Sequence, residues 1–122
     1  VLLTALANDI SFADSFATYL DRYARKGDLV VTISSSGNSE NVIRAIATAR
    51  KIGCTVITLS GLKPDNSSRK LGDVNFYVPG RTYGIVECAH QVLLHMMIDA
   101  FMGIHEWERT GYQNMNVSAF QL

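Results

Sequence analysis

The chain has 122 residues, of which 11 are Lys or Arg and 11 are Asp or Glu, so its formal net charge at pH 7 is zero. This length fits one compact domain with a single core. The balanced charge lacks the basic footprint of a nucleic-acid-binding protein and the acidic surplus of a disordered polyanion, so neither class is expected. The ligand has to be inferred from local motifs.

The cysteines and the longest apolar stretch both favour a soluble, intracellular protein. Cys54 and Cys88 lie in apolar runs without metal-type spacing, which predicts free thiols in a reducing, cytoplasmic compartment. The stretch 84–103 is long enough to span a membrane, but polar residues such as Glu87 and Asp99 interrupt it. We therefore expect a buried helix there and no membrane partner.

The first third of the chain predicts a strand, a helix and a second strand. Residues 1–7 are too short for a membrane span, lack the basic flank of a secretory signal and are interpreted as a strand. Apolar side chains then recur at three- and four-residue steps, which predicts an amphipathic helix capped by Asp9 or Ser11 and ending at Gly27. The apolar run 29–33 predicts a buried strand.

The remaining elements alternate in type along the chain. The pattern predicts a helix over 39–52, a strand over 54–59, a loop over 61–71 with a short helix near its end, a strand over 73–78 and the helix within 84–103. Repeated β-α-β units imply an α/β fold with a parallel sheet and helices on both faces. We predict one domain over 1–103 and a C-terminal tail over 104–122.

A serine-rich loop joins the second predicted strand to the helix after it. Ser34, Ser35, Ser36 and Ser39 supply four hydroxyls, and Gly37 allows a turn that other residues resist. Open parallel sheets bind ligands outside the carboxyl ends of their strands, and the unpaired N–H groups of a helix start favour anions. The loop therefore predicts a phosphate site. The alternative is that these serines cap the helix without a ligand.

The sequence around this loop resembles a known family. The run 27–42, GDLVVTISSSGNSENV, followed by Ala45, Ala49, Gly53 and the strand ending at Ser60-Gly61, is similar to the sugar isomerase (SIS) domain over residues 1 to about 102. The resemblance implies a flavodoxin-like, three-layer fold. It also implies that the partner is a phosphorylated sugar, whose phosphate is ligated by Ser34, Ser35, Ser36 and Ser39.

Within this family, residues 7–9 and 87–95 most resemble the phosphoheptose isomerases, which convert sedoheptulose 7-phosphate into D-glycero-D-manno-heptose 7-phosphate. The resemblance implies that Asp9 contacts the sugar and that His95 is a catalytic acid/base and a metal ligand. It places Glu87 at a metal-ligand position that is commonly glutamine, and the metal is zinc. Histidine and zinc suit an isomerisation that passes through an enediol and a developing oxyanion.

Helix geometry leaves other arrangements open. Glu87 and His95 are eight residues apart, roughly 12 Å along an ideal helix, so they share one ion only if the helix is distorted or long side chains converge. Glu87 and His90 are three residues apart and form a Glu-x-x-His pair of the kind that binds metals in helix bundles. Alternatively, His90 and His95 are buried, hydrogen-bonded residues of a subunit interface.

The helix within 84–103 also predicts an oligomer. It is apolar almost all round, which a helix on the surface of a monomer does not tolerate, so another subunit is expected to cover it. The family resemblance implies a homotetramer or a dimer.

Several features set this chain apart from the family pattern. It starts after the histidine and glutamate that complete the family's metal set, so we expect an N-terminally truncated, inactive piece with an exposed sheet edge. Gly84 stands where many phosphoheptose isomerases carry an acidic residue. A noncatalytic SIS module that binds a sugar phosphate or a protein, like the DnaA initiator-associating proteins, is the alternative. A Rossmann nucleotide enzyme is disfavoured because no G-x-G-x-x-G follows a strand.

Overall fold

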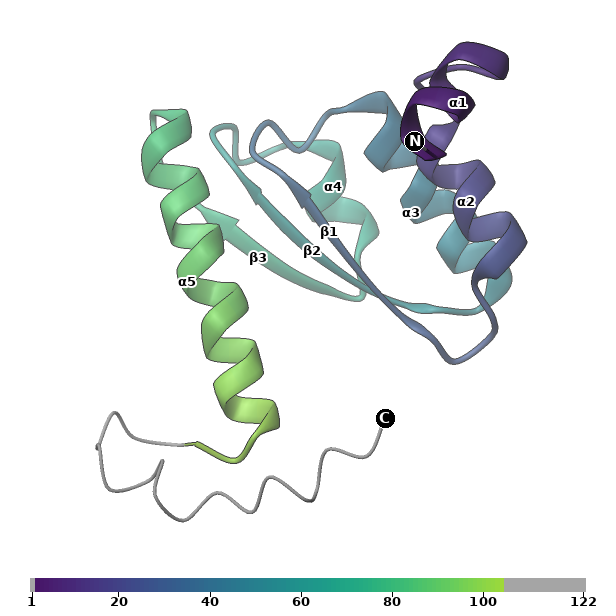
Figure 1. The fold of residues 1–122 in the computed structure, drawn as a ribbon. Helices are drawn as coiled ribbons and strands as arrows, with labels where there is room; N and C mark the ends of the chain where they lie inside the picture. The colour runs from purple at the N-terminus through teal and green to yellow at the C-terminus, as the bar shows by residue number, and fades with distance from the viewer. Residues whose placement is uncertain (1, 105–122) are drawn as a thin grey trace. The chain divides into compact units, whose positions relative to one another are not determined.

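The computed structural model describes residues 2–104, in which two helices are followed by three strands that alternate with three further helices (Figure 1). The elements are α1 (Leu2–Asp9), α2 (Ser15–Tyr23), β1 (Leu29–Ser34), α3 (Glu40–Ile52), β2 (Thr55–Gly61), α4 (Ser67–Leu71), β3 (Val74–Val78) and α5 (Tyr83–Phe101). The chain divides into two compact units, Val1–His90 and Gln91–Leu122, and α5 contributes to both. The predicted tail 104–122 lies almost entirely outside the described residues.

The three strands form one parallel sheet in the order β1-β2-β3. Ser34 at the end of β1 lies opposite Ser60 of β2, and Gly61 lies opposite Val78 at the end of β3. The carboxyl ends of all three strands therefore meet at one edge. The predicted α/β fold with a parallel sheet is confirmed, and the following loops are brought together where open sheets bind ligands.

The helix α3 covers one face of the sheet. Its sequence supplies an N-cap residue, an apolar inner face and a glycine that ends the helix. Ser39 occupies the N-cap with extended backbone, and Gly53 closes the helix in the left-handed conformation at φ 95°. Val42, Ile46 and Ala49 are buried on its inner side and pack with Val56 and Cys54, while Leu20 and Ala24 reach the same cluster.

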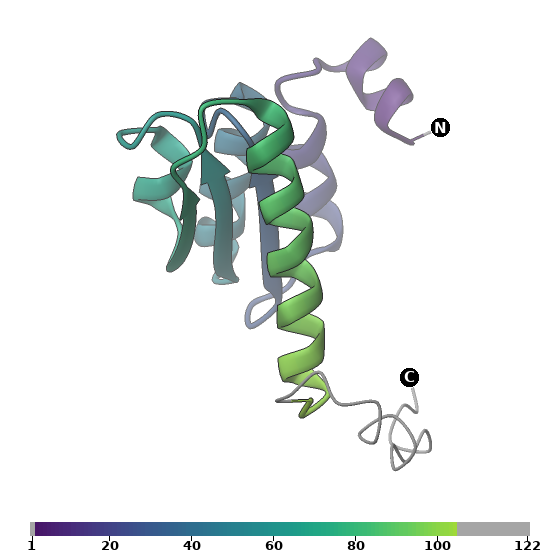
Figure 2. The same cartoon turned by 90° about the vertical axis from the view of Figure 1, so that its left-hand side faces the viewer.

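Helices lie on both faces, as predicted. The helices α2, α3 and α4 lie on one side of the sheet (Figures 1 and 2). On the other face, the fully buried Val86 in the first turns of α5 packs against Gly61 and Gly80. Alternate residues of β1 on that face, Leu29, Val31 and Ile33, are 40–59% exposed.

Three predictions for the start of the chain were wrong. Residues 1–7 were expected to form a strand, but Leu2–Asp9 is the helix α1, because leucine and alanine are strong helix formers and a short apolar run has no decisive period. The next helix has its N-cap at Asp14 instead of Asp9 or Ser11, since the Ser11 hydroxyl accepts from the Asp14 N–H at 3.0 Å and forms a turn first. That helix ends at Tyr23, before the expected Gly27.

Arg44 links α2 to the first turn of α3. Its guanidinium donates to Asp14 at 2.7 Å and to Glu40 at 2.8 Å. The bond from Arg44, helped by the Ser11 hydroxyl, lowers the pKa of Asp14 below its ordinary value. The bond between Arg44 and Asp14 stabilises the folded chain when the pH is above the pKa of the unfolded carboxyl. This stabilisation is lost as the pH falls through the lower pKa that Asp14 has in the folded chain.

Both cysteines are free thiols, as predicted, with Cys54 buried and Cys88 exposed. Among residues 2–104, no helix combines the length and the apolar character that a membrane crossing requires.

Two valines on neighbouring strands test where the core lies. Val56 is fully buried and Val74 is 46% exposed. We expect Val56→Ala to lower the free energy of unfolding by about 2–3 kcal/mol, through lost burial and a residual cavity, and Val74→Ala by less than about 1 kcal/mol. Urea denaturation followed by circular dichroism measures both; equal losses would contradict this assignment of the core.

Candidate phosphate-binding site

The serine loop is a tight turn between the end of β1 and the start of α3. The Gly37 N–H donates to the Ser34 carbonyl at 2.9 Å and approaches the Ser34 hydroxyl at 3.2 Å. The Ser34 hydroxyl in turn donates to Ser39 Oγ at 3.2 Å. Ser34 is buried, so its side chain holds the turn together from inside.

The outer part of the loop keeps donors available. Ser39 accepts from Ser34, which leaves its own hydroxyl proton free, and its side chain makes no capping bond to the helix. Ser36 is half-buried, and its oxygen accepts a 3.3 Å bond from the Asn38 N–H. In the described part of the chain, the backbone N–H groups of Glu40 and Asn41 donate no hydrogen bond. Free hydroxyls and amides at a helix start make this loop a candidate anion site, and Ser39 does not cap the helix through its side chain.

The helix α4 holds the serine loop in place through two hydrogen bonds from its backbone. The Ser68 N–H donates to the Gly37 carbonyl at 2.8 Å, and the Ser67 N–H donates to Asn38 Oδ1 at 3.0 Å. Asn66 is 1% exposed and lies directly against Gly37, where any Cβ would overlap its side chain. Gly37 has φ 65°, so both its backbone conformation and its surroundings demand glycine.

Sequence reasoning missed this support. Asn66 caps α4 by accepting from the Arg69 N–H at 2.9 Å, and its amide donates to the Lys63 carbonyl at 2.8 Å. An asparagine before Ser67 and Ser68 is a recognisable N-cap signal. Its contact with Gly37 comes only from the crossover that brings α4 beside the loop.

The start of α5 contacts the loop through Glu87. The Ser35 hydroxyl donates to Glu87 Oε1 at 3.0 Å, and the Ser35 carbonyl accepts from the Gly61 N–H at 3.1 Å. The structure therefore brings together five predicted site residues, Ser34, Ser35, Ser36, Ser39 and Glu87.

His90 lies in the interior of the first unit. It is 2% exposed, and its Nε2 is 3.1 Å from the Ser60 carbonyl. A carbonyl only accepts, so Nε2 carries the proton, and Nδ1 has no partner among the described residues. Since Glu87 bonds to Ser35 and His90 to Ser60, the geometry favours a buried structural histidine over the Glu-x-x-His metal pair.

Asp9 and His95 lie on the surfaces of their own units. Asp9 is exposed at the end of α1 and accepts from the Asn8 side chain at 2.9 Å. His95 is exposed, and the Gln91 amide nitrogen donates to its Nε2 at 3.0 Å, which places the proton of a neutral imidazole on Nδ1. The predicted roles of both residues stay predictions.

Residues 2–104 contain no group of three His, Cys, Asp or Glu side chains that could hold a metal ion. Glu87 Oε1 is engaged by Ser35, and His90 Nε2 by a backbone carbonyl. The side chains of this part of the chain therefore do not form a zinc site by themselves.

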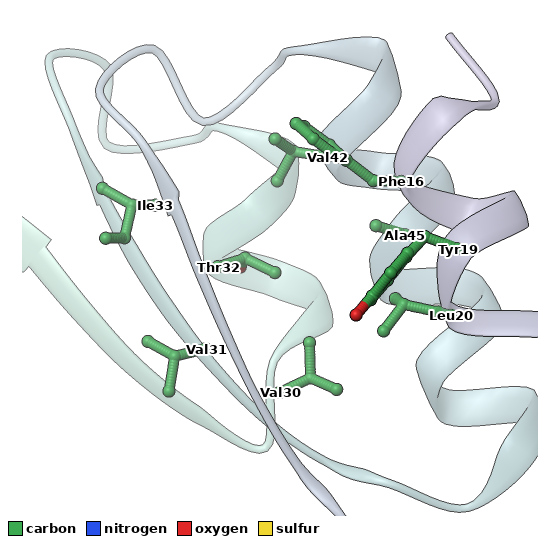
Figure 3. A pocket seen from close by; sticks show the side chains of 9 residues that line it. All are labelled: Phe16, Tyr19, Leu20, Val30, Val31, Thr32, Ile33, Val42 and Ala45. Carbon is green, nitrogen blue, oxygen red and sulfur yellow. The ribbon is translucent and has the colours of Figure 1, made fainter. Parts of the chain in front are cut away.

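A separate hollow of about 330 Å³ lies between α2, α3 and the outer edge of β1 (Figure 3). Its lining residues are Phe16, Tyr19, Leu20, Val30, Val31, Thr32, Ile33, Val42 and Ala45, and none of them is charged. An apolar hollow offers little to a phosphate dianion. The serine loop is therefore the better candidate for an anion.

Comparisons with known proteins show which family the sequence is similar to. Residues 2–61 match the family model of the SIS domain. The chain is 35% identical over 97 residues to the phosphoheptose isomerase of Fusobacterium nucleatum and 38% identical over 97 residues to that of Escherichia fergusonii, covering 80% and 79% of this chain. Each match covers 50% of the relative, so the chain spans about half the length of these curated relatives.

Two solved structures of phosphoheptose isomerases superpose on most of this chain. A phosphoheptose isomerase from Neisseria gonorrhoeae superposes with a TM-score of 0.77 at 34% identity, covering 81% of this chain and 55% of that one. The corresponding enzyme from Francisella tularensis superposes with a TM-score of 0.75 at 25% identity, covering 80% and 52%.

Two glycines test the geometry of the loop. We expect Gly37→Ala to abolish measurable phosphate binding, because the new Cβ would displace Asn66 and strain a positive φ. Gly84→Ala is the matched control, since a Cβ added there would have no atom within 4 Å and alanine favours a helix. Isothermal titration with inorganic phosphate measures both; unchanged binding in Gly37→Ala would refute the described turn.

Proposed function

We propose that this chain, whose residues 2–61 match the SIS domain family model, acts within a phosphosugar isomerase that interconverts sedoheptulose 7-phosphate and D-glycero-D-manno-heptose 7-phosphate. The observation that carries the proposal is the serine loop, which presents free hydroxyls and free amides at the start of α3. The similarity to phosphoheptose isomerases supports the choice of substrate.

The loop would bind the phosphate group of the sugar. Ser36 and Ser39 donate hydroxyl protons to phosphate oxygens, together with the N–H groups that begin α3. Ser34 holds Ser39 in place by donating to it at 3.2 Å. Ser35 is the fourth hydroxyl, and it reaches the phosphate when it turns away from Glu87. Arg44 offsets the negative charge of Glu40 beside this site.

His95 would move the proton between the two carbons that exchange oxidation state. Imidazole titrates near neutral pH, so it can take a proton from C1 of the ketose and return one to C2 of the enediol, while the C2 oxygen gains a proton and the C1 hydroxyl loses one. The basic nitrogen is Nε2, to which Gln91 donates at 3.0 Å, so Gln91 would release Nε2 for the proton transfer. Asp9 would accept a hydrogen bond from a sugar hydroxyl.

Zinc is proposed as the cofactor of the enzyme, with Glu87 and His95 as donors from this chain and the further ligands outside residues 2–104. When bound, zinc would stabilise the oxyanion of the enediol.

A second copy of the chain is the proposed partner, in a cytoplasmic homodimer or homotetramer. The second half of α5 exposes large apolar side chains, including Val92, Met96 and Ile98 at 53–56% and Phe101 at 85%. Apolar side chains concentrated on one helix are typical of a subunit interface.

A noncatalytic module that binds a sugar phosphate or a protein partner is the second candidate. It is favoured by the lack of a three-residue metal group within residues 2–104 and by the bond that ties Glu87 to Ser35. Both candidate functions use the same serine loop, but only the isomerase would convert the bound sugar phosphate.

Turnover and binding by the full-length protein with zinc test the proposal. We expect His95→Ala to lower kcat about 10²- to 10⁴-fold, with substrate binding retained, because it removes the acid/base group. We expect Ser36→Ala to weaken binding of sedoheptulose 7-phosphate about tenfold, because a hydrogen bond to a charged group is lost. NMR follows formation of the aldose, and isothermal titration gives the dissociation constants.

Ser67→Ala is the control, because Ser67 contacts the loop through its backbone N–H alone. Saturable binding without turnover by the unaltered protein would favour the noncatalytic module, and the absence of both would refute the two proposals together.

A further inference from the structure

We infer that Glu87 is a positioning residue that weakens phosphate binding by holding the hydroxyl of Ser35. The inference rests on the proposed function, because it assumes that the serine loop binds the phosphate of the substrate. It concerns this chain's own glutamate and the affinity of the loop.

The contact between Ser35 and Glu87 is anchored on both sides. The Ser35 backbone is fixed by the bond from the Gly61 N–H to its carbonyl at 3.1 Å. On α5, the neighbours of Glu87 are fixed by burial: Val86 is fully buried, and His90 is tied to the Ser60 carbonyl at 3.1 Å. The backbone of Glu87 is therefore held beside the loop, and the contact itself is made by the exposed Glu87 side chain and the half-buried Ser35 side chain.

One hydroxyl proton cannot serve two acceptors. Ser35 donates to Glu87 Oε1 at 3.0 Å, and a serine hydroxyl has a single proton to donate. When phosphate binds, Ser35 either stays with Glu87, so that the phosphate has one donor fewer, or turns to the phosphate and leaves the carboxylate without that bond. Both outcomes lower the affinity for phosphate.

The charge of Glu87 adds to this effect. Glu40 also lies beside the loop, but Arg44 donates to it at 2.8 Å and offsets its charge. Within residues 2–104, Glu87 forms no ion pair, so in the metal-free protein its carboxylate would face the bound phosphate without compensation. A glutamine at this position adds no negative charge, and its neutral amide oxygen holds the Ser35 hydroxyl less strongly than a carboxylate does.

Isothermal titration in the presence of EDTA separates this effect from any effect on a metal. Inorganic phosphate and sedoheptulose 7-phosphate are titrated into the full-length protein, Glu87→Gln, Ser35→Ala and the double variant. We expect Glu87→Gln to bind both ligands roughly three- to tenfold more tightly, the size expected for removing one nearby charge and freeing one donor. In the Ser35→Ala background the gain should fall to about twofold or less, because no hydroxyl remains to be freed.

The exposed carboxylate of Asp21 on α2 supplies the control for net charge, and Asp21→Asn should leave both affinities unchanged. A purely structural role of Glu87 would lower the affinity or the melting temperature of Glu87→Gln, and either an unchanged or a lowered affinity would overturn the inference alone. If neither the unaltered protein nor any variant binds either ligand, the phosphate site itself is refuted, and the inference falls with it.

Discussion

The turn at Gly37 is the constraint on which the candidate site depends. The chain must pass from the end of β1 to the start of α3 in a few residues, and it does so with a glycine at φ 65° that lies against the buried side chain of Asn66. The bond from the Ser68 N–H to the Gly37 carbonyl then fixes the turn to α4. Because three segments meet here, the donors at the start of α3 are held in place before any ligand binds.

The same arrangement explains why the site lies at a surface loop while the core lies elsewhere. The apolar side chains of α3 face β2 and α2, and this packing stabilises the helix whose free end forms the loop. Backbone amides at a helix start carry partial positive charge without a basic side chain. A chain with no net charge can therefore still offer an anion site.

Much of the fold could be predicted from the sequence because helix-ending glycines and apolar runs mark the boundaries of several elements. Gly53 ends α3, and the apolar run after Leu29 marks the strand β1, although the prediction that this strand is buried was wrong, because Leu29, Val31 and Ile33 are exposed. The opening helix α1 could not be predicted, since a short run rich in leucine and alanine fits a strand or a helix. Its state depends on neighbours that the sequence pattern does not show.

The candidate site was predictable in part for a similar reason. The serines of the loop are consecutive, so their clustering is visible in the sequence. The contact of Glu87 with Ser35 joins residues 52 positions apart, and the contact of Asn66 with Gly37 follows from a crossover, so both require the folded chain. His90 illustrates the opposite case: its i+3 spacing from Glu87 fitted a metal pair, while the structure turns its Nε2 to a backbone carbonyl.

The most direct test of the central claim is a map of amide chemical shifts in the full-length, ¹⁵N-labelled protein during titration with inorganic phosphate. The account predicts that the largest shifts occur at the amides of residues 36–41, at the start of α3. Shifts concentrated instead at Phe16, Tyr19 and Val30, around the apolar hollow, would contradict it.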